Sequence, residues 1–232
     1  MPIGQEVAFG SLPGARFKGI VLDTPYGQKT LSGKVDRIDK FKDYIRIIDY
    51  KTGSPESKAK EEKLYSGTNV QLYLYPLAFL DEKTRLAGAY YYKVNDEYAR
   101  DDKEAQAFIG KTLYDDEVVL ASDTRLESEK ESAKYNIKIT EKDGERTVKG
   151  STSLLTSAEL DSFLTYAKRV CEVGSTELSE GYIAPYPYTG ACKYCKFNGM
   201  CGFDPELDNT CRELSGITKA TIINAVKGDD DE

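Results

Sequence analysis

The segment Tyr44–Tyr50, with the sequence YIRIIDY, constrains the fold more than any other part of the chain. It holds three isoleucines and two tyrosines, and β-branched and aromatic residues favour strands. No other run in the 232 residues is as dense in these types. Gly53, Ser54 and Pro55 follow and end the regular structure. We therefore expect a buried central strand with a sheet around it.

The remaining elements predicted from hydrophobic periodicity alternate between strands and helices. Strands are expected at residues 15–24, 28–39 and 86–94, helices at 69–80 and 156–173, and a hairpin at 134–151 around Asp143–Gly144. The second helix begins with a capping box, Thr156–Glu159. Gly33, inside the strand at 28–39, indicates a bulge or a close approach of another group. This order predicts an α/β domain.

Composition excludes several classes of function. The chain has no histidine, so Ser-His-acid triads and histidine-based zinc sites are excluded. Its net charge of -7 is not typical of a protein that coats DNA. The chain contains no run of about 18 apolar residues, so no transmembrane helix is expected. The first residues lack a basic region followed by an apolar stretch, so no signal peptide is expected.

Asp49 and Lys51 end the central strand and share one face of it, because side chains alternate along a strand. A hairpin through residues 40–43 would bring Asp36 beside Asp49. Two carboxylates and a backbone carbonyl offer the oxygen ligands that Mg²⁺ or Mn²⁺ prefers. Lys51 could then orient a metal-activated water or stabilise negative charge on a phosphate. A salt bridge among the three side chains is the alternative interpretation.

Gln71 and Tyr75 lie four residues apart in the next predicted helix and therefore share a face. An amide and a phenol facing the carboxylates could hold a substrate phosphate and fix the lysine. The alternative is an ordinary amphipathic helix with its leucines in the core.

Three motifs, in their order and spacing, resemble the RecB-like branch of the PD-(D/E)XK nucleases. They are Leu31–Asp39 (LSGKVDRID), Ile47–Gly53 (IIDYKTG) and Gln71–Tyr75 (QLYLY). The resemblance covers about residues 17–80 and implies a restriction-endonuclease-like fold, in which helices flank a mixed central sheet. It implies that Asp36, Asp49 and the carbonyl of Tyr50 hold Mg²⁺ or Mn²⁺.

The same resemblance implies roles for the other motif residues. Lys51 is the catalytic lysine, and Gln71 and Tyr75 form the motif that follows it. Arg37 and Asp39 match the Asp-Arg-x-Asp run of the family and are implied in supporting roles. A helix upstream of the strands carries a further histidine or glutamate ligand in this family. Glu6 is the only early acidic residue here, and the ligand is not assigned to it.

Three cysteines, Cys192, Cys195 and Cys201, have the spacing C-x2-C-x5-C. From the residues alone, iron–sulfur ligation, a zinc knuckle and uncoordinated thiols all stay open. The segment resembles the C-terminal end of AddB-type helicase–nuclease subunits, in which a fourth cysteine lies far upstream. No cysteine precedes Cys171. We therefore expect a 4Fe-4S cluster in a longer protein, absent or incomplete in this chain; Cys211 is the alternative fourth ligand.

The resemblance implies a metal-dependent DNA exonuclease domain that hydrolyses phosphodiester bonds. It would belong to a bacterial cytoplasmic helicase–nuclease that processes double-strand DNA ends for recombinational repair. Single-stranded or unwound DNA and an AddA-type subunit are the expected partners, without membrane contact. Lys34, Arg37 and Lys51 would contact the DNA backbone. Whether this chain is active by itself stays open, because the upstream helix is not in it.

The expected domain organisation is a nuclease core at residues 1–190, with an insertion at about 115–150. A cysteine-containing tail at 191–232 ends in an acidic segment. Two alternatives to a nuclease domain of a helicase–nuclease remain. One is a non-catalytic DNA-binding or scaffold domain that retains the nuclease fold. The other is a stand-alone iron–sulfur exonuclease of the CRISPR-associated type.

Overall fold

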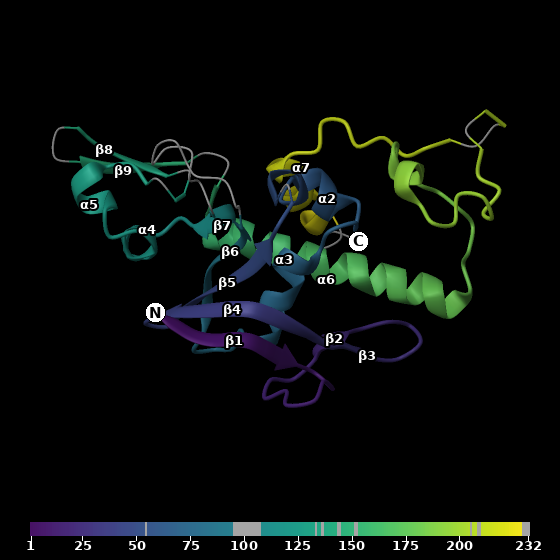
Figure 1. Ribbon diagram of the computed structural model, residues 1–232, viewed down its shortest axis with the longest axis horizontal. Coiled ribbons are helices and arrows are strands. Elements are labelled where there is room, and N and C mark those ends of the chain that lie inside the picture. Colours follow the sequence, from purple (N-terminus) through teal and green to yellow (C-terminus); the bar gives the residue numbers. More distant parts are fainter. Residues whose placement is uncertain are drawn as a thin grey trace.

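A six-stranded mixed sheet forms the centre of the molecule, with helices packed against it (Figure 1). The computed structural model describes residues 1–53, 55–94, 108–132, 134–135, 137–142, 145–150, 153–204, 206–207 and 210–228. The strand order is β1-β4-β5-β6-β7-β10. The strands are β1 (Pro2–Phe9), β4 (Gly33–Phe41), β5 (Tyr44–Lys51), β6 (Arg85–Lys93), β7 (Phe108–Leu113) and β10 (Leu154–Leu155). The predicted α/β fold with a mixed central sheet is confirmed.

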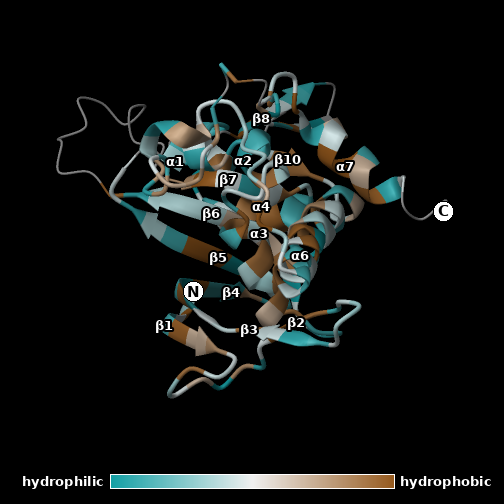
Figure 2. Cartoon of the chain, turned by 90° about the vertical axis from the view of Figure 1, so that its right-hand side faces the viewer, coloured by the Kyte–Doolittle hydropathy of each residue, from teal (hydrophilic) through white to brown (hydrophobic). Residues whose placement is uncertain are grey.

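Strand β5 lies in the interior of the sheet, as the sequence predicts. It pairs antiparallel with β4 on one side and parallel with β6 on the other. A tight hairpin joins β4 to β5, with Phe41 opposite Tyr44. Ile47 and Ile48 point to opposite faces, and both are buried. Figure 2 shows the hydrophobic stretch of β5 between β4 and β6.

The strand expected at residues 28–39 is interrupted, which corrects the prediction. Its first part is β3 (Lys29–Leu31), which pairs with β2 (Ile20–Leu22) in a separate two-stranded sheet. Its second part, β4, begins at Gly33. A Cβ atom at Gly33 would lie 2.7 Å from the Phe9 ring and 3.0 Å from the Tyr75 ring. The glycine is therefore explained by a close approach of two rings.

The predicted hairpin near residues 134–151 is present as β8 (Lys138–Lys142) and β9 (Glu145–Lys149). Its expected turn, Asp143–Gly144, lies outside the described residues. Two short helices precede the hairpin, α4 (Asp116–Ser122) and α5 (Leu126–Glu129).

The long helix α6 (Ser157–Glu180) begins at the predicted capping box and runs seven residues beyond the predicted end at 173. Gly181, with a positive φ of 72°, caps its C-terminus. Helix α7 (Lys219–Lys227) packs against α6, where Arg169 Nη1 donates to the carbonyl of Ala225 at 2.8 Å.

The single helix expected at residues 69–80 is instead two short pieces. They are α3 (Gln71–Leu74) and a 3₁₀ turn, η1 (Tyr75–Ala78). Pro76 explains the change, because proline has no N–H to continue the α-helical bonding. The other short helices are α1 (Pro55–Lys58), α2 (Glu61–Tyr65) and the 3₁₀ turn η2 (Ala191–Tyr194).

Two hydrophobic clusters fill the two faces of the sheet. The larger includes Ile47, Leu72 and Phe163 and lies between the sheet and helices α3 and α6. The smaller includes Ile48, Tyr90 and Tyr135 on the opposite face, toward the β8–β9 hairpin. Of the described helices, none combines the length and apolarity that crossing a membrane would require.

Candidate active site

Strands β4 and β5 bring together the three side chains that the sequence singles out. The Asp36 carboxylate accepts a hydrogen bond from the backbone N–H of Tyr50 at 2.8 Å. Asp49 and Lys51 lie on one face of β5, and Lys51 Nζ is 2.6 Å from Asp49 Oδ2. This arrangement lies at the C-terminal end of β5, with carboxylates from both strands.

The Asp49 carboxylate is held in an unfavourable environment for a negative charge. Its side chain is only 13% exposed. Burial raises the pKa of Asp49 above its ordinary value, and the negative charge of Asp36 raises it further, although Lys51 and Lys58 oppose this. A bound cation would relieve this penalty, because it adds positive charge beside both carboxylates.

The ion pair left open by the sequence does form, between Lys51 and Asp49. The buried Asp49 Oδ2 therefore has the Lys51 ammonium as a charged partner at hydrogen-bond distance, and this contact opposes the effect of burial on the pKa of Asp49. A buried carboxylate is costly unless it is paired or coordinates a cation.

The residues present suit a cation that takes part of its ligands from water and substrate. In the described part of the chain, no three Cys, Asp or Glu side chains converge to hold a metal. Mg²⁺ commonly uses one or two protein carboxylates together with waters and phosphate oxygens. Asp36 and Asp49 meet this requirement. The Tyr50 carbonyl points to the same side of β5 as its N–H, which faces Asp36.

Glu6, the early acidic residue, lies on β1 and forms an ion pair with Lys34 of β4. Its side chain is exposed. The described structure thus gives this carboxylate a cationic partner on the neighbouring strand.

Gln71 and Tyr75 lie beside the carboxylates although their helix is interrupted. Burial raises the pKa of Tyr75, the charges of Asp49 and Asp36 raise it further, and a hydrogen bond with Gln71 opposes them. The Tyr75 ring packs edge-on against Phe9 at a centroid distance of 5.0 Å. The two side chains therefore form one wall of the site.

Tyr91 of β6 is a neighbour of the site that sequence analysis missed. It lies opposite Asp49 in the parallel register, and Lys51 Nζ is 5.3 Å from its ring centroid. Its hydroxyl donates to Asn69 Oδ1 at 2.8 Å. Only the pairing of β5 with β6 places Tyr91 here, so no local pattern could have identified it.

Arg37 and Asp39 lie on the other face of the sheet. In the β4–β5 register Arg37 is opposite Ile48, and Asp39 is opposite Arg46. Arg46 lies on this face as well. The sequence analysis did not single it out, although its spacing of three residues from Asp49 along β5 indicates that the two side chains point to opposite faces.

The cysteine tail does not present a formed cluster site. Cys195 and Cys201 are exposed. Burial raises the pKa of Cys192, and the neighbouring thiols of Cys211, Cys195 and Cys201 raise it further. Cys171 lies apart in α6, against the core, where burial raises its pKa. The thiols are neighbours, but among the described residues they do not converge into a metal-binding group.

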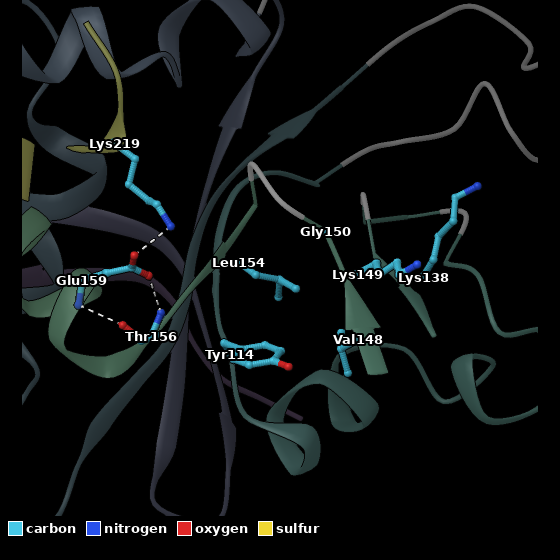
Figure 3. A pocket seen from close by; sticks show the side chains of 9 residues that line it. All are labelled: Tyr114, Lys138, Val148, Lys149, Gly150, Leu154, Thr156, Glu159 and Lys219. Carbon is cyan, nitrogen blue, oxygen red and sulfur yellow. Dashed lines mark hydrogen bonds and ion pairs between the residues drawn. The ribbon is translucent and has the colours of Figure 1, made fainter. Parts of the chain in front are cut away.

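A cavity of about 630 Å³ lies away from these residues (Figure 3). Tyr114, Val148 and Leu154 line it together with three lysines. Tyr114 follows β7, which runs antiparallel to β6 and therefore opposite to β5. The cavity is thus near the end of the sheet opposite Asp49, and Lys219 at its rim pairs with Glu159 at 2.8 Å.

Comparison with known proteins identifies the fold family of this site. The family model described as "PD-(D/E)XK nuclease superfamily" matches residues 1–202. An ATP-dependent helicase/deoxyribonuclease subunit of Desulforudis audaxviator is 32% identical over 95% of this chain and 21% of its own length. The protein of the same description from Clostridioides difficile is 30% identical over 98% of this chain and 22% of its own. The chain therefore spans about a fifth of these relatives, and it belongs to the PD-(D/E)XK nuclease superfamily.

Proposed function

We propose that this chain is a Mg²⁺- or Mn²⁺-dependent deoxyribonuclease domain that acts as an exonuclease on phosphodiester bonds. One observation carries the proposal. In a chain of this superfamily, Asp36, Asp49 and Lys51 lie together at the end of β5, and the Asp49 Oδ2, which lies 2.6 Å from Lys51 Nζ, is buried. Such an oxygen is suited to a divalent cation.

Each residue has a task in this proposal. Asp36 and Asp49, with the Tyr50 carbonyl, would hold the cation, which when bound polarises the phosphate and lowers the pKa of a water. Lys51 would orient that water for attack on phosphorus. Gln71 and Tyr75 would position a phosphate oxygen from their wall of the site. No covalent bond between enzyme and DNA is required.

The similarity to helicase/deoxyribonuclease subunits supports a wider proposal for the whole protein. The domain would act on single-stranded or unwound DNA in the bacterial cytoplasm, beside an AddA-type subunit, during recombinational repair of DNA ends. A 4Fe-4S cluster would be bound in the longer protein only. In the described residues the thiols do not converge into a group of three.

The test is cleavage of end-labelled single-stranded DNA by the chain and by Lys51→Ala. We expect product with Mg²⁺ or Mn²⁺, none with EDTA, and a loss of about 10²- to 10⁴-fold in the variant, as is typical for a group that assists proton transfer. Lys168→Ala is the matched control. Lys168 lies on α6, and its ion-pair partners are Asp23 and Glu172. Circular single-stranded DNA, which has no ends, should resist cleavage.

Two outcomes would change the proposal. Cleavage of the circular substrate would replace exonuclease with endonuclease action. Metal-dependent DNA binding without cleavage, equal in the chain and in Lys51→Ala, would favour a non-catalytic domain that retains the fold.

A further inference from the structure

A row of aromatic side chains crosses the sheet on the face opposite Lys51. Tyr50 of β5 lies opposite Tyr92 of β6, and Tyr92 lies opposite Phe108 of β7. The ring centroids of Tyr50 and Tyr92 are 5.6 Å apart, and those of Tyr92 and Phe108 are 4.9 Å apart. Both pairs meet edge to face, with interplanar angles of 84° and 70°, an arrangement that aromatic pairs favour. The three rings are therefore connected by direct contacts.

The row is buried at one end and open at the other. Tyr135, which precedes the β8–β9 hairpin, is 2% exposed and stacks on Phe108 with the ring centroids 4.9 Å apart. Phe108 and Tyr92 are partly buried against the smaller hydrophobic cluster. Tyr50, at the other end, is 41% exposed. The buried rings thus hold in place an outer ring that is open to solvent.

Tyr50 is also fixed to the candidate active site. It stands between Asp49 and Lys51 in β5, and its N–H donates to the Asp36 carboxylate at 2.8 Å. Because side chains alternate along a strand, its ring lies on the face opposite the Asp49 and Lys51 side chains. The candidate site for a phosphate and an open aromatic ring therefore occupy the two faces of one strand end.

Single-stranded DNA fits both faces together. Its unpaired bases are free to stack on aromatic side chains, and every base has an aromatic face, so such binding does not depend on sequence. A single strand that bends around the end of β5 places a phosphate on the Lys51 face and a neighbouring base on Tyr50. The bases of a duplex are already stacked on each other, and taking one out of the stack costs free energy.

We propose that Tyr50, held edge-on by Tyr92, is a substrate-binding residue on which an unpaired base of single-stranded DNA stacks beside the cleaved phosphate. This inference rests on the proposed function and deepens it, because it assigns the preference for unpaired DNA to one side chain. The ring contacts the base and takes no part in the attack on phosphorus.

The direct test uses a tryptophan at the open end of the row. The chain contains no tryptophan, so Tyr50→Trp introduces the only indole. Its fluorescence is measured during titration with an oligothymidylate in Ca²⁺, a cation that takes oxygen ligands as Mg²⁺ does, and a gel checks that the DNA stays intact. A stacked base should quench the indole, whereas an abasic oligomer of equal length and charge should not. Equal fluorescence with the two oligomers at saturation would overturn the inference.

Tyr26→Trp is the matched control for quenching that does not require stacking. Tyr26 is 54% exposed and lies between β2 and β3, outside the row. An indole at this position should respond equally to the two oligomers. Base-dependent quenching as strong as that of Tyr50→Trp would show that exposure alone explains the signal, and would contradict the inference.

The contribution of the ring to affinity is measured with Tyr50→Leu, which keeps an apolar side chain and the backbone. Kd for a labelled oligothymidylate, followed by fluorescence anisotropy, should rise about 5- to 100-fold, the range that loss of one base-stacking contact produces. Kd for the abasic oligomer and for a blunt duplex should stay within about twofold. Tyr50→Phe retains the ring and should keep the wild-type Kd for all three. An unchanged Kd in Tyr50→Leu, or an equal rise for all three ligands, would contradict stacking.

Cleavage by the wild type separates the inference from the proposed function. If the wild type cleaves single-stranded DNA with Mg²⁺ or Mn²⁺ while Tyr50→Trp shows no base-dependent quenching, only the inference fails. If Tyr50→Trp shows that quenching and the wild type does not cleave, the proposed nuclease activity fails while base binding by this residue stands. If the wild type binds no oligothymidylate, both fail.

Discussion

Asp39 is a buried carboxylate of this sheet, and two arginines offset the cost of burying its charge. Burial raises its pKa, but the hydrogen bonds and charges of Arg37 and Arg46 outweigh burial and hold the pKa below its ordinary value. Ionised Asp39 therefore stabilises the fold at pH values above about 3.9, the ordinary value for aspartate. This contribution is lost as the pH falls through the lower pKa of the folded state.

We predict that Asp39→Asn lowers the free energy of unfolding at pH 7 by about 3–5 kcal/mol, since it leaves two arginines without their buried partner. The difference from the wild type should shrink as the pH falls below about 3.9 toward the lower pKa of the folded state, because the unfolded wild type then binds a proton that the folded protein does not. Urea unfolding followed by circular dichroism from pH 7 to pH 3 measures both. A difference that is independent of pH would show that the charge is not responsible.

At the scale of elements, helix α6 is the longest of the described helices and connects the core to the tail. The Thr156 side chain accepts a hydrogen bond from the Glu159 N–H at 3.3 Å, and Glu159 in turn accepts from the Thr156 N–H at 2.8 Å. Glu159 also pairs with Lys219 at the start of α7. The capping box thus stabilises α6 and its contact with α7.

Thr156→Ala should lower the free energy of unfolding by about 1 kcal/mol, because the Glu159 N–H at the helix start loses its acceptor. Ser162→Ala is the control. Ser162 lies within α6 and, among the described residues, bonds the carbonyl of Ala158, so its replacement by the better helix former should not destabilise the protein. Thermal unfolding of both variants measures the difference, and equal melting temperatures would show that the cap contributes nothing.

At the scale of the whole molecule, Arg212 holds the cysteine tail together. Its N–H donates to the Pro187 carbonyl at 2.8 Å, and its Nε donates to the Tyr186 carbonyl at 2.8 Å. Its guanidinium lies 4.0 Å from the Tyr188 ring centroid. These contacts bring residue 211 back toward residues 186–192, which explains why Cys211 and Cys192 are neighbours.

Arg212→Ala should make the tail open more often without affecting the sheet. We expect limited proteolysis to cut between residues 182 and 216 several-fold faster, since cleavage follows the population of the open state. The melting temperature should change by no more than a few degrees. Lys193→Ala, which removes only a contact with the Tyr194 ring, is the control. Uniform cleavage of both variants and the wild type would contradict the role of Arg212.

Local sequence patterns predicted the elements of this protein whose formation depends on residues close together in the chain. The β-branched run Tyr44–Tyr50 predicted β5, because such residues pack well only in a buried strand. The capping box predicted the start of α6, because its hydrogen bonds join residues three apart. The alternation of side chains along β5 predicted that Asp49 and Lys51 share one face, because the two residues are two positions apart.

Only the tertiary structure decided which residues from distant segments meet. The parallel pairing of β5 with β6 brings Tyr91 opposite Asp49, and packing of the insertion brings Tyr135 to Arg46. Neither contact leaves a periodic trace in the sequence, because the partners are 42 and 89 residues apart. The close approach that requires a glycine at position 33 likewise depends on rings arriving from β1 and η1. Local patterns thus identified the candidate residues of this site, and long-range packing determined what surrounds them.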